Sequence, residues 1–257
     1  PDIMHVEEGQ IEPLRDIEII NLELVLADMQ TVAKRLHNIE RDAKRDDKTA
    51  LLEQAALGKA ESALSGGAFA SSAHFTAEET KAIKLLNLLT MKPIMYALNK
   101  KAGGHNLDEA KDPRYAKLLQ ALNEMHAIYV LVDAAIEGEL NDVAGDDKEQ
   151  LRREFGVLGD GVDELIRSAY RLLGLMTYFT TGKDETRGWT VKKGSTAPEA
   201  GAAIHSDFKD KFIRAEIVPS ETLLEAGSYS AARERGSIRT EGKEYVVKDG
   251  DVIEFKI

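Results

Sequence analysis

Two polar residues follow an apolar stretch near the middle of the chain. Residues 94–98, IMYAL, have the apolar character of a buried strand, and Asn99-Lys100 comes directly after them. At such a strand end the carboxamide of Asn99 could contact the edge of a purine base. The alkyl stem of Lys100 could pack along the base or along a loop that binds phosphates. From the dipeptide alone, the alternative that Asn99 simply ends the strand stays open.

A long helical pattern comes before this strand. In the segment 14–45, apolar residues recur every three or four positions, at Val25, Met29, Val32, Leu36, Ile39 and Ala43. This spacing predicts a helix with the 3.5-residue seam of a coiled coil. KRDDKT interrupts the pattern and ALLEQAALGKAESAL resumes it. The two segments therefore predict an antiparallel helical hairpin with its tip near Asp46-Asp47.

Four basic residues gather at the predicted tip: Arg41, Lys44, Arg45 and Lys48. They could contact the phosphates of an RNA, or they could be the solvated end of two helices. The whole chain carries a net charge of −11, which suits it poorly for coating nucleic acid over its entire surface. Contact with RNA would therefore need a local basic patch of this kind.

Strands and helices alternate between residues 76 and 173. Thr76 and Glu79 have the spacing of a capping box, which predicts that a helix begins in FTAEETKAIKLLNLL. Beyond the strand 94–98, PRYAKLLQALNEM predicts a helix, AIYVLV a second buried strand, and DELIRSAYRLLGL another helix. This alternation predicts parallel strands buried on both faces. The segment is therefore α/β, and the hairpin is an insertion before it.

Short strands dominate the sequence from Met176 onward. They are predicted in MTYFTT, RGWTVKK, FIRAEIV, EYVVKD and DVIEFKI, which are separated by Gly, Pro and Asp turns. PSETLLEAGSYSAARERG contributes one helical stretch among them. This combination predicts a small α+β domain at the end of the chain.

Composition narrows the class of protein. The chain has 257 residues, enough for two or three domains. It contains no cysteine, which excludes disulfides, thiolate chemistry and cysteine-ligated zinc and fits a reducing cytoplasm. No apolar run approaches the roughly 20 residues of a membrane-spanning helix, so we expect no membrane partner. The histidines show no metal-ligand spacing, and no metal-binding residue is predicted among them.

Several of these stretches resemble one protein family. DIEIINLELVLADMQTVAKRL resembles the helical entry of the YchF/Obg-like ATPases, and LLTMKPIMYALN resembles their base-reading strand. The stretch from GVDELIRSAY to FIRAEIV and the closing EGKEYVVKDGDVIEFKI resemble the C-terminal TGS domain of that family. The resemblance covers nearly the whole chain. It is most specific from Gly174 to Ile257, where long stretches match in order.

The resemblance implies an α/β fold in three parts. Residues 1–20 and 76–173 would form the C-terminal part of a P-loop NTPase sheet, the G domain of translation-factor-type nucleotide hydrolases. Residues 21–75 would be an inserted antiparallel coiled-coil hairpin. Residues 174–257 would be an α+β TGS domain with the ubiquitin-like β-grasp fold.

The resemblance also implies a function. Members of the family hydrolyse ATP in preference to GTP with Mg²⁺, and they associate with ribosomes in the cytoplasm. Their P-loop and magnesium-sensing segments have no counterpart in this sequence, and PDIMHVEEGQIEP resembles sequence beyond both. We therefore expect an N-terminally truncated protein that is inactive alone. The alternative is a non-enzymatic ribosome- or RNA-binding module that uses the hairpin tip and the TGS surface.

Residue roles follow from the same resemblance. Asn99 and Lys100 would contact the base, and the backbone N–H of Ala134 or Ala135 would face it. Asp133 could accept a hydrogen bond from an exocyclic amine or cap the helix after it. Three positions after Asn99, guanine-specific relatives have Asp and YchF proteins usually have Glu, but this sequence has Ala, at position 102. Guanine selectivity is therefore unsupported, and adenine is not positively selected either.

The TGS-like segment contributes one further candidate surface. His205, Asp207 and Phe208 lie in its best-matching stretch, and we predict that they contact a partner. A turn with a polar cap is the alternative for these residues.

Overall fold

The computed structural model describes residues 12–43, 47–101, 103–104, 106–141, 143, 146–154, 161–182 and 185–257, with only the backbone of residues 41–43, 146 and 149. The chain divides into two compact units, Pro1–Gly161 and Val162–Ile257. Each unit contains hydrophobic clusters of its own.

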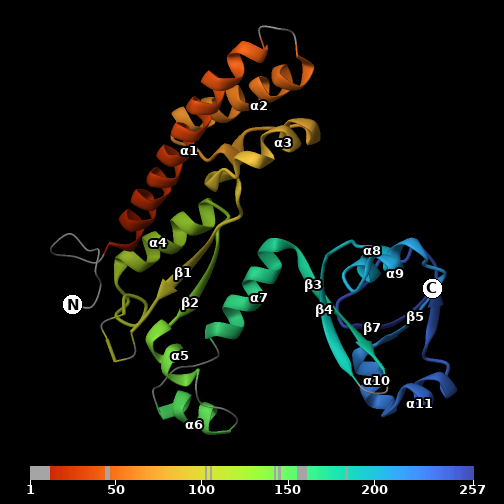
Figure 1. Cartoon of the computed structure of the whole chain (residues 1–257). Coiled ribbons are helices and arrows are strands. Elements are labelled where there is room, and N and C mark those ends of the chain that lie inside the picture. The colour runs from red at the N-terminus through yellow and green to blue at the C-terminus, as the bar shows by residue number, and fades with distance from the viewer. Residues whose placement is uncertain are drawn as a thin grey trace. The chain divides into compact units, whose positions relative to one another are not determined.

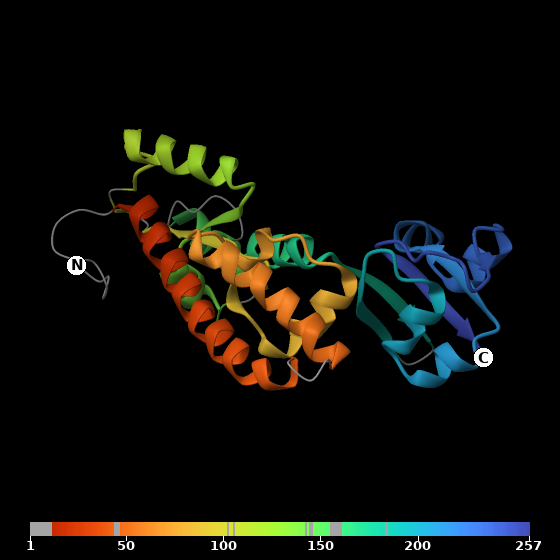
Figure 2. The same ribbon diagram turned by 90° about the horizontal axis from the view of Figure 1, so that it is seen from above.

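The first unit begins with two long helices, which we call the helix pair: α1 (Pro13–Ala43) and α2 (Lys48–Ser65). They lie side by side in both views (Figures 1 and 2). Val25, Val32 and Ile39 of the predicted seam are buried in one cluster with Ala56 and Ala60 of α2. Alanines at these positions let the two helices approach closely. Both predicted helices are confirmed, and the predicted seam residues Val25, Val32 and Ile39 lie in the hydrophobic cluster that the two helices share.

Short helical turns follow and pack back on the helix pair: η1 (Ala70–Ser72), α3 (Ala77–Ile83), η2 (Lys84–Leu86) and η3 (Leu89–Met91). The capping box is confirmed, because Thr76 Oγ1 accepts from Glu79 N–H at 3.1 Å and Glu79 Oε2 accepts from Thr76 N–H at 2.8 Å. The helix predicted there ends early, at Ile83. Asn87 adopts a left-handed conformation (φ 51°), which an α-helix cannot include.

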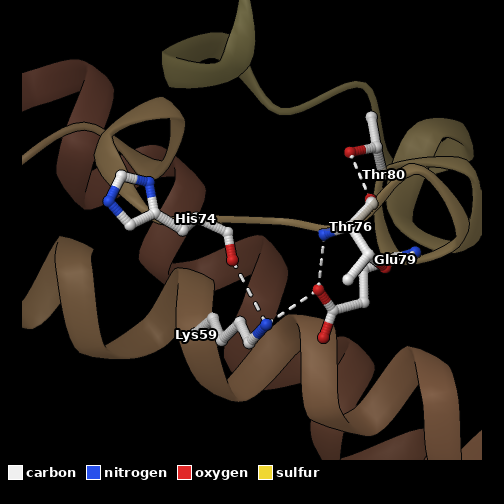
Figure 3. Close-up of polar contacts among 5 residues, drawn as sticks. All are labelled: Lys59, His74, Thr76, Glu79 and Thr80. Atoms are coloured by element: carbon white, nitrogen blue, oxygen red, sulfur yellow. Dashed lines mark hydrogen bonds and ion pairs between the residues drawn. The ribbon is translucent and has the colours of Figure 1, made fainter.

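Lys59 joins α2 to the start of α3 (Figure 3). Its ammonium donates to Glu79 Oε2 at 2.8 Å and to the backbone oxygen of His74 at 3.2 Å. The hydrogen bonds from Lys59 and from the N–H of Thr76 lower the pKa of Glu79, whose side chain is buried. The capping carboxylate therefore stays ionised and holds α3 against the helix pair.

A buried carboxylate on α1 fixes the segment that leads into the first strand. Asp28 is 2% exposed. It accepts hydrogen bonds from Leu89 N–H at 2.9 Å, Thr90 N–H at 2.7 Å and the Thr90 hydroxyl at 2.6 Å. Thr90 Oγ1 in turn accepts from Ala70 N–H at 3.1 Å. One network thus joins α1, η1 and η3.

The α/β part of the first unit follows: β1 (Met95–Asn99), α4 (Pro113–Glu124), β2 (Ile128–Val132), α5 (Ala134–Leu140) and α6 (Asp146–Glu154). β1 and β2 pair in parallel, as predicted, with Met95 opposite Ile128. The expectation that these strands are buried on both faces was wrong, because Val130 is the one buried residue among the ten that form them. Ile17 of α1 and Leu118 of α4 are buried in one cluster, and Tyr96 of β1 packs against it. This cluster holds β1 against both helices.

The second unit contains α7 (Gly161–Leu173) from Val162 onward and a five-stranded sheet in the order β4-β3-β7-β5-β6. The strands are β3 (Leu175–Thr181), β4 (Thr186–Lys192), β5 (Arg214–Pro219), β6 (Arg239–Glu241) and β7 (Asp251–Lys256). The short helices are α8 (Ala197–Ala202), α9 (Ser206–Asp210), α10 (Ser220–Ala226) and α11 (Tyr229–Glu234). Tyr178 is fully buried between sheet and α8, and its hydroxyl donates to Ala200 O at 2.8 Å.

Two expectations for this unit were wrong. EYVVKD, residues 244–249, is not a strand, and only Val246 forms a bridge, to Thr196. The carboxylate of Asp251 accepts from Lys248 N–H at 2.9 Å and from the Tyr245 hydroxyl at 2.8 Å, which curls this segment. A strand that was not predicted, β6, pairs with β5 on the side opposite β7. The stretch 219–236 contains two helices rather than one, because Gly227 (φ 79°) ends α10.

The observed boundaries differ in position from the sequence-based domain limits. The second unit begins at Val162, whereas Gly174 marks the turn between α7 and β3. α1 already begins at Pro13, ahead of the insertion limit at residue 21. Ile83 and Leu88 belong to the same hydrophobic cluster as the helix pair, so its packing continues past residue 75.

Candidate functional site

The parallel pairing of β1 and β2 brings the predicted base-contacting residues together. Asn99 lies opposite Val132, and the N–H of Lys100 donates to the backbone oxygen of Val132 at 2.7 Å. Asn99 and Asp133 therefore lie at the carboxyl ends of neighbouring strands. In α/β sheets, ligands bind outside these ends.

The carboxamide of Asn99 connects the two strand ends. Its Oδ1 accepts a hydrogen bond from the N–H of Ala134 at 3.0 Å. This contact fixes the orientation of the amide, because the reverse orientation would bring two donors face to face. The Nδ2 group then points away from Ala134 and has no partner within the described part of the chain. The exposed side chain of Asn99 thus keeps two N–H donors for a ligand.

Asp133 caps the helix that follows β2. Its side chain is 8% exposed, and Oδ1 accepts from Ile136 N–H at 3.1 Å, which confirms the helix-cap alternative. The N–H of Ala134 is already bonded to Asn99. Of the two N–H groups predicted to face a base, that of Ala135 is the one without a partner among the described residues.

Lys100 lies in an ion cluster. Its ammonium is 2.7 Å from a carboxylate oxygen of Asp108 and 2.7 Å from one of Glu109. Burial acts to raise the pKa of Asp108, but the hydrogen bond and charge of Lys100 outweigh burial and lower it. Burial likewise acts to lower the pKa of Lys100, and the two carboxylates raise it. All three groups are therefore charged near neutral pH, and Lys100 has no free charge to offer a phosphate.

Asn106 folds the loop after Lys100 back on itself. Its Oδ1 accepts from the N–H of Lys101 at 3.0 Å, and its Nδ2 donates to the oxygen of Lys101 at 2.9 Å. One side chain thus satisfies both backbone groups of Lys101, as a neighbouring strand would. This arrangement returns the chain to the strand end and brings Asp108 next to Lys100.

A cavity of about 510 Å³ opens beside this strand end. Apolar side chains of α1, β1 and α4 form much of its wall, including Ile17, Leu98 and Leu118. Asn99 and Asp108 line the same cavity. The cavity therefore brings a hydrogen-bond donor and a carboxylate together beside the apolar side chains along β1.

Sequence reasoning missed Asn106 and Asp108. Neither lies within a recognisable motif, and both reach the strand end only because the Gly-rich loop turns back. A usable signal was the surplus of polar residues in HNLDE, close after a loop that lacks the expected acidic residue. That residue was expected at Ala102, which lies outside the described residues.

The other predicted site residues lie elsewhere. Lys48 is the exposed first residue of α2, whereas Lys44 and Arg45 and the side chain of Arg41 lie outside the described residues. In the second unit, His205 caps α9 by accepting from Asp207 N–H at 3.2 Å. This supports the polar-cap alternative, at a short helix rather than a turn.

Phe208 is less exposed than His205 and Asp207, the two residues predicted to contact a partner together with it. His205 and Asp207 are exposed to solvent by 65% and 43% of their side chains. The ring of Phe208 is half-buried and packs edge-on against Phe255 at 5.7 Å between ring centroids.

The described residues contain no group of three or more His, Asp or Glu side chains arranged to hold a metal ion. None of the helices in the described ranges has both the length and the apolar character needed to cross a bilayer.

Fold and site define a two-unit, mixed α/β protein. One unit presents polar groups at the ends of parallel strands, next to a long helix pair, and the other is a mixed five-stranded sheet with short helices. Known proteins share this combination of units.

A family model named YchF-GTPase_C, described as a protein of unknown function (DUF933), matches residues 175–257. The ribosome-binding ATPase YchF of Bacillus subtilis is 46% identical over 259 residues, covering 99% of this chain and 69% of that protein. The protein of the same name from Escherichia coli O157:H7 is 37% identical over 254 residues, with the same coverage of both chains.

A solved structure agrees with these relatives. The Schizosaccharomyces pombe YchF GTPase has a TM-score of 0.78 and 28% identity, covering 99% of this chain and 68% of that one. The chain belongs to the YchF family.

Proposed function

We propose that this chain is the base-contacting and ribosome-contacting part of a YchF-type nucleotide hydrolase that uses ATP, with GTP as the other candidate nucleotide. Its relatives bear the names ribosome-binding ATPase and YchF GTPase. The observation that carries the proposal is the hydrogen bond from Ala134 N–H to Asn99 Oδ1. It joins two parallel strand ends and aims the remaining amide donors outward.

In this proposal, Asn99 Nδ2 and the N–H of Ala135 donate to ring acceptors of the purine. Asp133 holds the helix whose first turn carries Ala134 and Ala135. Lys100 contributes through the loop that it anchors and not through a free charge. The base therefore meets donors on rigid elements, which keeps the entropic cost of binding low.

Hydrolysis needs more than a base site. A phosphate-binding loop positions the phosphates, and Mg²⁺ neutralises their charge during transfer. Residues 1–257 contain no GxxxxGK[ST] stretch, so in this proposal the P-loop and the Mg²⁺ ligands belong to a part of the hydrolase outside these residues. Residues 1–257 alone should then be catalytically inactive.

The remaining parts fit a partner-binding role. We interpret the helix pair as the family's coiled-coil hairpin, and the second unit as a TGS domain with the β-grasp fold. Both would contact the ribosome, which would place the protein in the cytoplasm.

Two substitutions at one position test the base site. Asn99→Asp keeps an oxygen acceptor for Ala134 N–H but removes the outward donors, whereas Asn99→Ala removes both. In a hydrolase that contains these residues together with a P-loop, we expect Asn99→Asp to raise KM for ATP or GTP about tenfold or more without loss of stability, since one such hydrogen bond is worth about 1–1.5 kcal/mol. Asn99→Ala should also lower stability. Unchanged KM in both variants, or absence of hydrolysis in a folded protein that contains these residues together with a P-loop, would count against the proposal.

The alternative is a non-enzymatic ribosome- or RNA-binding module. The sequence cluster Arg41, Lys44, Arg45 and Lys48 favours it. Co-sedimentation of residues 1–257 with ribosomes should then weaken steeply between low and moderate salt, because phosphate contacts release counterions. Replacing all four residues by alanine should abolish the salt-sensitive part of the co-sedimentation with ribosomes. Sedimentation that is equal in the native and alanine chains would exclude the tip as the contact.

A further inference from the structure

We infer that Asp108 is the acceptor that reads the exocyclic amino group of a purine base at the Asn99 site. The inference rests on the proposed function, and it assigns base selectivity to a residue six positions beyond the alanine at position 102. The ligand class is a purine nucleotide with an amino group on the ring, either the 6-amino group of adenine or the 2-amino group of guanine.

The loop fold carries Asp108 to the right place. Asn106 clips both backbone groups of Lys101 at 3.0 and 2.9 Å, which closes the loop within a few residues of Asn99. Lys100, the residue next to Asn99, then holds Asp108 at 2.7 Å. Asn99 and Asp108 also line one cavity. A base that accepts from Asn99 would therefore lie within reach of this carboxylate.

The charge balance leaves Asp108 able to accept a hydrogen bond from a ligand. Lys100 carries one positive charge but contacts two carboxylates, so the cluster is negative by one charge. Glu109 is 57% exposed and does not line the cavity, whereas Asp108 is 22% exposed and does. A carboxylate has about four lone-pair directions, so the bond to Lys100 still leaves acceptor sites for a ligand. Pairing Lys100 needs only Glu109, and the second carboxylate faces the cavity.

Selectivity among purines needs an acceptor of this kind. Asn99 Nδ2 and Ala135 N–H are donors, and ring acceptors are common to all purines. An amino group is recognised only by an acceptor, and a partly buried carboxylate is the strongest one available to a protein. Among the cavity-lining residues of the described chain, one other carboxylate occurs, that of Asp16 on α1. Asp16 serves as a control, because it lies on α1 and not on the loop that follows β1.

Three mononucleotides separate the alternatives. AMP and GMP each carry one exocyclic amino group, and IMP carries none. We would titrate residues 1–257 with each, following the amide signals of Ala134 and Ala135 by NMR at millimolar concentrations. The native chain should bind AMP, GMP or both about tenfold more tightly than IMP, as expected for one hydrogen bond to a charged group. The nucleotide that shows the preference identifies the amino group that is read.

Asp108→Ala should reduce that affinity to the level of IMP, and Asp108→Asn should retain an intermediate preference. Glu109→Ala removes the other partner of Lys100, and Asp16→Ala removes the other carboxylate of the cavity, so both should keep the preference.

A preference that survives Asp108→Ala in a chain with native amide dispersion would overturn the assignment. Equal loss in Glu109→Ala would also overturn it, because the effect would then come from Lys100. If none of the three nucleotides shifts the signals, the base site itself fails together with Asp108. If all three bind native chain equally, only the Asp108 assignment fails.

Discussion

Replacing Asp28 should destabilise the first unit more than an ordinary surface change on the same helix. In Asp28→Ala, three donors lose their acceptor: the N–H groups of Leu89 and Thr90 and the Thr90 hydroxyl. A buried polar group left without a partner costs about 1–3 kcal/mol. The two Thr90 donors are buried, whereas the N–H of Leu89 is only partly so. We therefore expect a loss of about 4 kcal/mol in the free energy of unfolding, more than most substitutions cost.

Two spectroscopic probes can localise this loss. Trp189, the single tryptophan of the chain, lies on β4 in the second unit, so its fluorescence reports that unit. Far-UV circular dichroism is dominated by the long helices of the first. In urea, Asp28→Ala should lower the midpoint of the circular dichroism transition and leave the fluorescence midpoint in place. Glu23→Ala, at an exposed position of α1, is the matched control and should change stability by less than about 0.5 kcal/mol.

A double-mutant cycle tests the cause. Thr90→Val replaces the hydroxyl by a methyl group and breaks its bonds to Asp28 and to the N–H of Ala70. Combined with Asp28→Ala, it should show a coupling energy of about 1–2 kcal/mol, as contacting residues do. An Asp28→Ala variant no less stable than Glu23→Ala, or a cycle that is simply additive, would refute the network argument.

Two further predictions concern packing and pH. In Gly201→Ala the new Cβ would lie 2.8 Å from the Cβ of Phe208. The free energy of unfolding followed by Trp189 fluorescence should therefore fall by about 1–3 kcal/mol. Gly58 has open space around it, so Gly58→Ala is the control and should not lose stability. The hydrogen bonds from the side chain and backbone of Arg114 lower the pKa of Asp112 from 3.8 to about 2. Because this pKa is depressed in the folded state, the stabilisation is complete above the unfolded value and disappears as pH falls from about 4 to about 2. Arg114→Gln should return the pKa of Asp112 toward 3.8 in an NMR titration, and an unchanged value would contradict the assignment.

The sequence predicted the regular elements of the site well. The strand 94–98 and AIYVLV are apolar runs flanked by helical patterns, and that alternation is sufficient to predict a parallel pair. Parallel pairing in turn predicts that Asn99 and Asp133 meet at one edge. The hydrogen bond between Asn99 and Ala134 goes beyond such a pattern, because it depends on the stagger of the two strand ends.

Irregular backbone was predicted poorly. The curl of residues 244–249 depends on one carboxylate, that of Asp251, which lies beyond the segment that it shapes. EYVVKD has the residue types of a strand, so a local pattern could not reveal the curl. The loop after Lys100 is a similar case, since Asn106 acts on a backbone five residues away. In both places a side chain forms the hydrogen bonds that the backbone of a neighbouring strand would otherwise form. No periodic pattern of residue types in the sequence indicates such a contact.

Asp28 suggests where such features can be found in a sequence. It lies on the buried stripe of α1 between Val25 and Val32, where a carboxylate costs more than an apolar residue unless it is fully hydrogen-bonded. The η3 turn has only three residues, so it cannot satisfy its own N–H groups as a long helix does. A carboxylate on the helix that packs against the turn accepts from them instead. An acidic residue within an otherwise apolar helix stripe therefore indicates that a piece of irregular backbone docks there, and here that piece leads directly into the strand that ends at Asn99.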